Sequence, residues 1–265
     1  MTKIAFFDID GTMINVPHHM LKPTEKTKRA LIEFQKQGNY IVVATARGYI
    51  PASVTEIPFD GFIGCDGGYI VFKDEVLLDN LFTVEDLNLQ NSVYKTTHGQ
   101  YIVCEHKDSF YSDKDGELIK KHLRLYRGTD KLPDDYNDKW CFQTVKANTV
   151  TALFYHAKDL HDAIEMLPSD WVINAYDTGH IRMDVHPKGF SKGQACQFLC
   201  QRLNINKEDS FAFGDGENDI EMLELAGTGI AMNNASDTVK EYADMVTLSV
   251  DDDGIAEAFS KLFGI

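Results

Sequence analysis

A short apolar run that ends in two acids constrains this chain more than any other feature of its sequence. Residues 4–7 (Ile-Ala-Phe-Phe) are apolar at every position, which predicts a strand buried on both faces. The run leads into Asp-Ile-Asp-Gly-Thr at residues 8–12. Carboxylates that follow a buried strand lie at the sheet edge where open α/β folds bind their ligands. A strand followed by an ordinary Asp-Gly turn is the other interpretation, and the motifs found later in the chain argue against it.

The same pattern recurs further along the chain. Apolar runs at 40–44 and 210–213 predict two more buried strands, each of which ends at polar residues. These polar residues are Thr45 and Arg47 after the first run, and Asp215, Asn218 and Asp219 after the second. A further cation, Lys192, stands in a loop that leads into a predicted helix. Because the ends of parallel strands gather at one edge of a sheet, we expect these side chains to meet.

Strands and helices alternate through both ends of the chain, which predicts a doubly wound, parallel, Rossmann-like α/β sheet. Between them, residues 82–183 combine hairpin-spaced strands with helices, which is typical of an α+β module. We therefore expect a catalytic core domain formed by residues 1–81 and 184–265, and an inserted domain at 82–183. Within the insertion the pattern predicts a loop over 128–138 and a strand over 141–145.

Composition limits the functions open to this chain. The formal net charge of −15 argues against a nucleic-acid partner, which would require a basic surface. There is no apolar run long enough to span a membrane, and the N-terminus does not resemble a signal peptide. The five cysteines form no Cys-x-x-Cys pair. We expect a cytoplasmic protein, and no obligate protein partner is evident.

Several carboxylates at one sheet edge repel one another and persist together mainly when a cation holds them. Hard oxygen ligands favour Mg²⁺. We expect the ion to be held by the side chains of Asp8 and Asp215 and by the main-chain oxygen of Asp10. Asp219 would hold a metal-bound water or orient Lys192.

The motif at residues 7–12 resembles the first motif of the haloacid dehalogenase-like phosphohydrolases, and the whole chain resembles their Cof-type sugar-phosphate phosphatases with a type IIB cap. The resemblance implies that Asp8 is the nucleophile and Asp10 the acid/base. It also implies that Thr45 and Lys192 bind phosphate and that Asp215 binds the metal. These roles agree with the chemistry of the residues, since a carboxylate can attack phosphorus and a second can move the proton.

Further residues are candidates for contact with the substrate. They are Gly11, Thr12, Arg47, Asn218 and, in the inserted domain, Arg182 with its neighbours His180 and Asp184 on one strand face. For Arg47 a structural ion pair is an equal alternative, and a solvated sheet face is the alternative for the Arg182 group. The chain departs from the family pattern at Asp66, where Asn is frequent, and at Asn233, where Gly is frequent. Asp66 is expected to add negative charge near the mouth of the site.

These observations predict a Mg²⁺-dependent phosphatase for small phosphate monoesters, with sugar phosphates foremost. A phosphotransferase or mutase on the same scaffold is one alternative, and a non-catalytic sensor of a phosphorylated metabolite is another. The inserted domain would act as a lid that excludes water and selects the leaving group.

Overall fold

The computed structural model describes residues 1–105, 108–132 and 139–265. The chain divides into two compact units: Met1–Asp79 with Phe190–Ile265, here called the core unit, and Asn80–Gly189, the second unit. The insertion begins near the expected residue 82, but the chain returns to the core unit after residue 189 and not at 184. The reason is that strand β10 (Arg182–His186) pairs along its whole length within the second unit.

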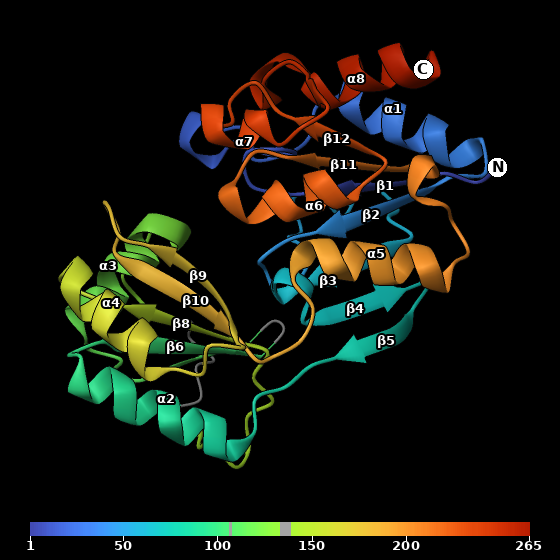
Figure 1. Ribbon diagram of the computed structural model, residues 1–265. Coiled ribbons are helices and arrows are strands. Elements are labelled where there is room, and N and C mark those ends of the chain that lie inside the picture. Colours follow the sequence, from blue (N-terminus) through green and yellow to red (C-terminus); the bar gives the residue numbers. More distant parts are fainter. Residues whose placement is uncertain (106–107, 133–138) are drawn as a thin grey trace. The chain divides into compact units, whose positions relative to one another are not determined.

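The core unit is built on one twisted sheet in which the first strand is central (Figure 1). Its strands lie in the order β13 (Met245–Val246), β12 (Thr228–Ala231), β11 (Ser210–Gly214), β1 (Ile4–Phe7), β2 (Tyr40–Ala44), β3 (Gly61–Gly64), β4 (Tyr69–Phe72) and β5 (Glu75–Asp79). Pairing is parallel from β13 to β3, and β4 and β5 add an antiparallel hairpin at the edge. The expected doubly wound parallel sheet is confirmed, and the strand order reverses at β1, where such folds bind ligands.

Helices cover both faces of this sheet (Figure 1). On one face lie α1 (Glu25–Lys36) and α8 (Gly254–Phe263), and on the other lie α5 (Lys192–Arg202), α6 (Ile220–Leu225) and α7 (Asp237–Glu241). Helix α1 begins where the Thr24 side chain accepts a hydrogen bond from the N–H of Thr27, and α5 begins in the same way at Ser191. The two caps fix where each helix starts relative to the sheet.

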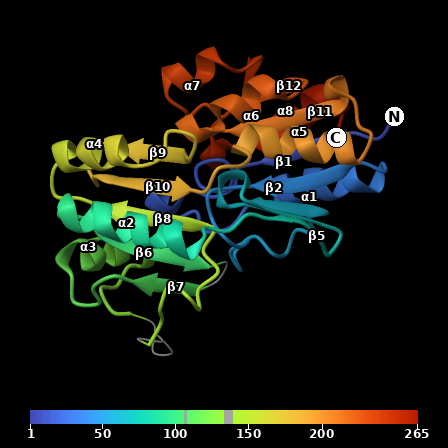
Figure 2. The same ribbon diagram turned by 60° about the horizontal axis from the view of Figure 1, so that its bottom comes forward.

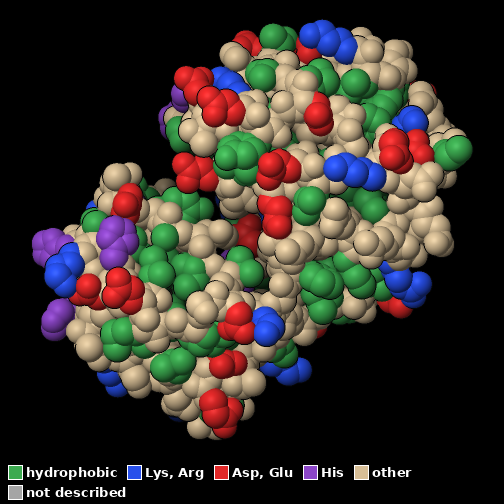
Figure 3. Space-filling model, viewed as in Figure 1, with side chains coloured by type: hydrophobic (Ala, Val, Ile, Leu, Met, Phe, Trp, Pro, Cys, Tyr) green, Lys and Arg blue, Asp and Glu red, His purple; other side chains and the backbone are tan. Residues whose placement is uncertain are grey.

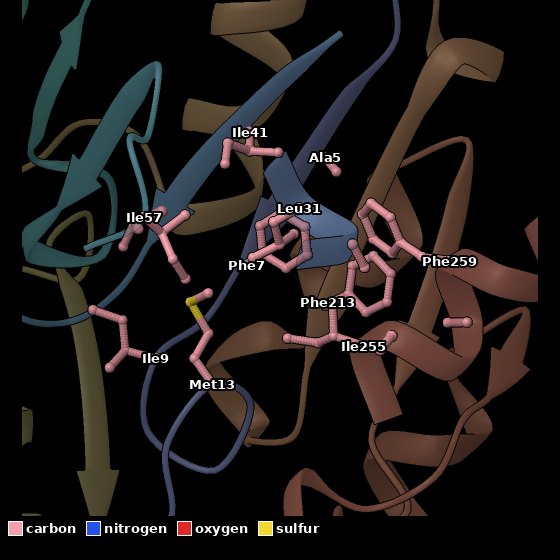
Figure 4. Close-up of a cluster of buried hydrophobic side chains, with 14 of the residues drawn as sticks. Ala5, Phe7, Ile9, Met13, Leu31, Ile41, Ile57, Phe213, Ile255 and Phe259 are labelled. Atoms are coloured by element: carbon pink, nitrogen blue, oxygen red, sulfur yellow. The ribbon is translucent and has the colours of Figure 1, made fainter. Parts of the chain in front are cut away.

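Aromatic side chains anchor the central strands against α8 (Figure 4). Phe7 of β1 stacks on Phe213 of β11 with ring centroids 4.9 Å apart, and both rings contact Phe259 of α8. All three side chains are fully buried. Truncating a buried phenylalanine to alanine typically costs about 3–5 kcal/mol. This packing holds the ends of β1 and β11 together, immediately before the acidic motifs.

The second unit contains an antiparallel sheet, whose strands can be told apart in Figure 2. Their order is β7 (Asp108–Tyr111), β6 (Gln100–Glu105), β8 (Thr149–Leu153), β10 and β9 (Val172–Tyr176). Helices α2 (Val84–Thr96) and α4 (Ala157–Met166) pack on one face, and α3 (Glu117–Arg127) packs on residues of the other. This arrangement is an α+β module, as the sequence predicts.

Two local predictions for the second unit are wrong. Residues 141–145 form a turn and not a strand, because both the N–H and the hydroxyl of Thr144 bond the carbonyl of Cys141. His180 precedes β10 and hence does not share a strand face with Arg182. Of the loop expected over 128–138, residues 133–138 lie outside the described part of the chain.

Among the described helices, none is long and apolar enough to cross a membrane. On the face shown in Figure 3, acidic side chains are scattered widely over the surface, in keeping with the net charge of −15.

Candidate active site

The first two acidic motifs meet because β1 and β11 are neighbours. Phe7 pairs with Phe213, and the N–H of Asp8 extends the ladder by donating to the carbonyl of Phe213 at 3.0 Å. Asp8 and Asp215 therefore leave the sheet side by side at its carboxyl edge. The Asp8 residue is only 7% exposed, so its carboxylate lies in the protein interior.

The loop after Asp8 is folded against Asp215. Gly11 has φ of +96°, and a Cβ on this residue would lie 2.0 Å from Oδ2 of Asp215. Only glycine accepts both this backbone conformation and this close approach. The next residue, Thr12, donates its hydroxyl to Oδ1 of Asp215 at 2.9 Å. The loop is thus shaped to hold the Asp215 carboxylate.

Gly11 and Thr12 were expected to contact the substrate, but the polar groups described below have partners within the protein. Their N–H groups donate to the carbonyls of Ile14 and Ile9 inside the loop. The Thr12 hydroxyl is used by Asp215. In this structure both residues support a neighbouring carboxylate, and a contact with substrate stays a prediction.

Lys192, the first residue of α5, lies between two carboxylates. Its ammonium group donates to Asp8 Oδ1 at 2.7 Å and to Asp219 Oδ1 at 2.5 Å, and the residue is 2% exposed. The other oxygen of Asp219 accepts from the N–H groups of Asp215 and Gly216, both at 2.9 Å. Asp219 therefore orients the lysine and the turn that carries Asp215, which is one of the two roles expected for it.

Electrostatics at this cluster favour an additional cation. Burial raises the pKa of Asp8 well above its ordinary value, and the Lys192 cation lowers it only in part. Burial raises the pKa of Asp215 to about 7, and the charge of Asp219 contributes to that rise. Burial alone would lower the pKa of Lys192, but the carboxylates of Asp219 and Asp8 raise it overall. One lysine thus faces three carboxylates.

A divalent ion fits this donor set. One oxygen from each of Asp8, Asp215 and Asp219 lies within 4.8 Å of the others, in the only such acidic or histidine cluster among the described residues. Both oxygens of Asp219 already serve Lys192 and the main chain, so Asp8 and Asp215 are the side chains best placed to bind the ion. Carboxylate oxygens are the ligands preferred by Mg²⁺.

Asp10 and Arg47 form a pair at the ends of β1 and β2. The guanidinium donates through Nε to Asp10 Oδ2 and through a terminal nitrogen to Oδ1, both at 2.7 Å. The bond to Asp10 raises the pKa of Arg47. Arg47 was expected either to contact the substrate or to form a structural ion pair, and in the structure it forms the ion pair. The side chain of Asp10 is bonded to Arg47, and a metal contact through the main-chain oxygen of Asp10 stays a prediction.

Thr45 follows β2 and is almost fully buried. Its hydroxyl oxygen accepts from the N–H of Arg47 at 3.2 Å, which leaves the hydroxyl hydrogen available as a donor. Its N–H donates to the carbonyl of Ile63 on β3, so its position is set by the sheet.

Asn218 donates to Asp66 Oδ1 at 3.1 Å. Asp66 is 2% exposed and takes a left-handed conformation, with φ of +47°. The expectation that Asp66 lies at the mouth of the site is wrong, because the turn after β3 directs the residue inward. Its negative charge also raises the pKa of Lys192.

Arg182 belongs to the second unit. Its guanidinium lies over the ring of Tyr176, 3.7 Å from the centroid, and its Nε is 3.8 Å from Asp184 Oδ2. The Asp184 carboxylate also accepts a 2.6 Å hydrogen bond from Thr151. Arg182 is therefore held within its own sheet by an aromatic ring and an acid.

Sequence reasoning assigned no role to Asn234. Its amide donates to the carbonyl of Gly11 at 2.8 Å and to Asp215 Oδ2 at 3.3 Å, and its oxygen accepts from the N–H of Val250 at 2.9 Å. The sequence could have pointed to Asn234, because this polar residue follows strand β12 and so lies at the same sheet edge as the acidic motifs. This residue joins three segments around Asp215.

The fold and the site together define an α/β protein with a Rossmann-like core and an acidic cluster at the carboxyl edge of its sheet. The chain belongs to the haloacid dehalogenase-like hydrolases, since the family model of that description matches residues 5–259. It is accordingly a hydrolase of this superfamily, and several proteins similar to it are named phosphatases.

Proteins similar to this chain extend over its full length. "Putative phosphatase YkrA" of Bacillus subtilis (strain 168) is 29% identical over 98% of both chains. "Phosphatase YwpJ" of the same organism is 26% identical, over 98% of this chain and 99% of that protein. The solved structure of the subclass IIB sugar phosphatase BT4131 matches with a TM-score of 0.81 at 27% identity, over 99% of each chain.

Proposed function

We propose that this phosphatase hydrolyses small phosphate monoesters, sugar phosphates foremost, through a phosphorylated Asp8 and with Mg²⁺ as cofactor. The observation that carries the proposal is the contact of the buried Asp8 carboxylate with Lys192, beside Asp215 and Asp219. The printed description of BT4131 as a sugar phosphatase supports the choice of substrate class.

The proposed reaction has two halves. An oxygen of Asp8 attacks phosphorus, the bond to the leaving oxygen breaks, and Asp10 gives that oxygen a proton. Asp10 then takes a proton from water, which attacks phosphorus, releases phosphate and restores the Asp8 carboxylate. Lys192 and the Thr45 hydroxyl offset the negative charge of the phosphoryl oxygens. Mg²⁺ bound by Asp8 and Asp215, with the Asp10 main-chain oxygen, would supply further positive charge to the same oxygens.

We propose that the second unit selects the leaving group. Arg182 is the candidate contact, because its cation is held in a defined orientation by Tyr176 and Asp184. Arg182→Ala should then change the relative rates on a panel of sugar phosphates without lowering all of them equally. Arg182→Lys, which keeps the charge, is the matched control. An unchanged substrate profile in Arg182→Ala would remove this residue from the proposal.

The function is tested by phosphate release from a panel of phosphorylated sugars, nucleotides and vitamins, in Mg²⁺ and in EDTA. We expect metal-dependent release that Asp8→Asn abolishes while the protein stays folded. Transfer of the phosphoryl group to an added sugar phosphate, in place of release, would favour a mutase or transferase. Calorimetric binding of an ester without turnover would favour a sensor.

A further inference from the structure

Arg47 binds both oxygens of the Asp10 carboxylate, one through Nε and the other through a terminal nitrogen. The two bonds are 2.7 Å long and end on different oxygens, so the fork of the guanidinium matches the fork of the carboxylate. The side chains are only partly exposed, at 32% for Arg47 and 46% for Asp10. This geometry fixes the plane and the direction of the carboxylate, which a single hydrogen bond would not do.

The main chain that carries Arg47 is itself held at two points. Its N–H donates to the Thr45 hydroxyl at 3.2 Å, and its carbonyl accepts from the N–H of Cys65 at 3.0 Å. The guanidinium therefore reaches Asp10 from a backbone tied both to β2 and to the turn after β3. By contrast, Asp10 lies on the loop after β1, where its side chain has little other support among the bonds of the described residues.

We infer that Arg47 is a positioning residue that aims the carboxyl group of Asp10 at the leaving oxygen, and not a ligand of the phosphoryl group. The inference rests on the proposed function, in which Asp10 moves the proton. Each carboxylate oxygen has two acceptor positions, and the fork occupies one on each. The other positions remain for the proton in transit, which passes from Asp10 to the leaving oxygen and later from water to Asp10.

The two roles of Arg47 predict different dependence on the leaving group. An alkoxide leaves only with a proton, whereas 4-nitrophenolate leaves readily without one. A misdirected Asp10 should slow cleavage of an alkyl ester far more than cleavage of an activated aryl ester. Loss of a phosphoryl ligand should instead slow both, because both esters carry the same phosphoryl group.

The experiment measures kcat/KM, which reports the first half-reaction, for benzyl phosphate and 4-nitrophenyl phosphate with Mg²⁺. The proteins compared are wild type, Arg47→Ala, Arg47→Lys, Asp10→Asn and the double variant Arg47→Ala/Asp10→Asn. We expect Arg47→Ala to lower kcat/KM for benzyl phosphate by about 10²-fold more than for 4-nitrophenyl phosphate, the scale of general acid catalysis. Arg47→Lys, which lacks the fork, should recover only part of the loss. In the Asp10→Asn background, Arg47→Ala should cause no further loss.

The inference would be overturned if Arg47→Ala lowered kcat/KM equally for the two esters while Asp10→Asn lowered it more for benzyl phosphate. That result would leave the proposed function intact. Equal loss for the two esters in Asp10→Asn would overturn the acid/base role of Asp10 and the inference with it. Thermal unfolding of each variant with and without Mg²⁺ shows whether the fold persists. If Arg47→Ala does not fold, kcat/KM for the two esters is compared in Arg47→Lys instead. An equal loss of kcat/KM for both esters in that variant would overturn the inference.

Discussion

The hydroxyl of Thr12 donates a 2.9 Å hydrogen bond to Oδ1 of Asp215, a residue 203 positions further along the chain. The other oxygen of that carboxylate lies 3.3 Å from the amide nitrogen of Asn234. Two uncharged donors thus orient the carboxylate without neutralising it. Residues that orient metal ligands in this way typically contribute strongly to metal affinity.

Thr12→Val should weaken Mg²⁺ binding because it removes the hydroxyl and keeps the shape of the side chain. We expect a loss of about 10–100-fold in affinity, measured by calorimetric titration of Mg²⁺. Thr12→Ser, which retains the hydroxyl, is the control and should bind Mg²⁺ nearly as well as the wild type. Equal affinity in Thr12→Val and wild type would show that this bond does not support the metal site.

Gly11→Ala should disturb the site beyond the cost of its backbone conformation. The added Cβ would meet Asp215 Oδ2 at 2.0 Å, whereas at Gly38, which also has positive φ, nothing lies within 4 Å. Gly38→Ala is therefore a matched control that carries only the conformational cost, about 1–2 kcal/mol. We expect both variants to lose stability in urea unfolding, and only Gly11→Ala to lose Mg²⁺ affinity. Similar Mg²⁺ affinity in the two variants would contradict the close approach to Asp215.

Lys192→Met should destabilise the protein in EDTA because it leaves the buried carboxylates of Asp8 and Asp219 without their cation. Removing one partner of a buried ion pair typically costs about 3–5 kcal/mol. The control is Lys3→Met, which breaks the more exposed pair with Asp209, for which a loss of about 0–1 kcal/mol is expected. Urea unfolding measures both. A loss no larger in Lys192→Met than in Lys3→Met would refute the role of Lys192 in holding the carboxylates.

The stability of the metal-free protein should fall as the pH rises from 5 to 8. Burial raises the pKa of Asp215 from 3.8 to about 7, so the folded protein holds a proton that the unfolded chain releases. This stabilising contribution is complete below the unfolded pKa and is lost as the pH rises through the folded pKa, by at most about 1.4 kcal/mol per pH unit for one group.

Mg²⁺ should reverse this loss, because the cation takes the place of the proton between the carboxylates. Thermal unfolding in EDTA and in Mg²⁺ should therefore show a larger stabilisation by Mg²⁺ at pH 8 than at pH 5.5. The same stabilisation at both pH values would argue against proton–metal competition at this site. Asp215→Asn, which has no carboxylate at this position to titrate, is the control and should show a weaker dependence on pH.

The sequence alone predicted the architecture of the core unit because its strands carry a local signal. A strand such as β1, apolar at every position, can only be buried on both faces, and parallel strands bring their carboxyl ends to one edge. The positions of Asp8, Asp215 and Lys192 at that edge follow from these two facts and from the motifs. A strand was predicted wrongly at residues 141–145 (Cys-Phe-Gln-Thr-Val), which are not apolar throughout and where the bonds from Thr144 to the carbonyl of Cys141 form a turn.

The partner of each polar side chain was decided by the tertiary structure. Whether Arg47 faces Asp10 or the substrate, and whether Asp66 lies at the surface or inside, depends on how loops from different strands approach one another. The bonds from Thr12 to Asp215 and from Asn234 to Gly11 join segments more than 200 positions apart, and no local pattern encodes them. The pattern of apolar residues therefore determined the fold and the sheet edge at which the site lies. The hydrogen-bond partner of each polar side chain at that edge was determined by how the loops meet after folding.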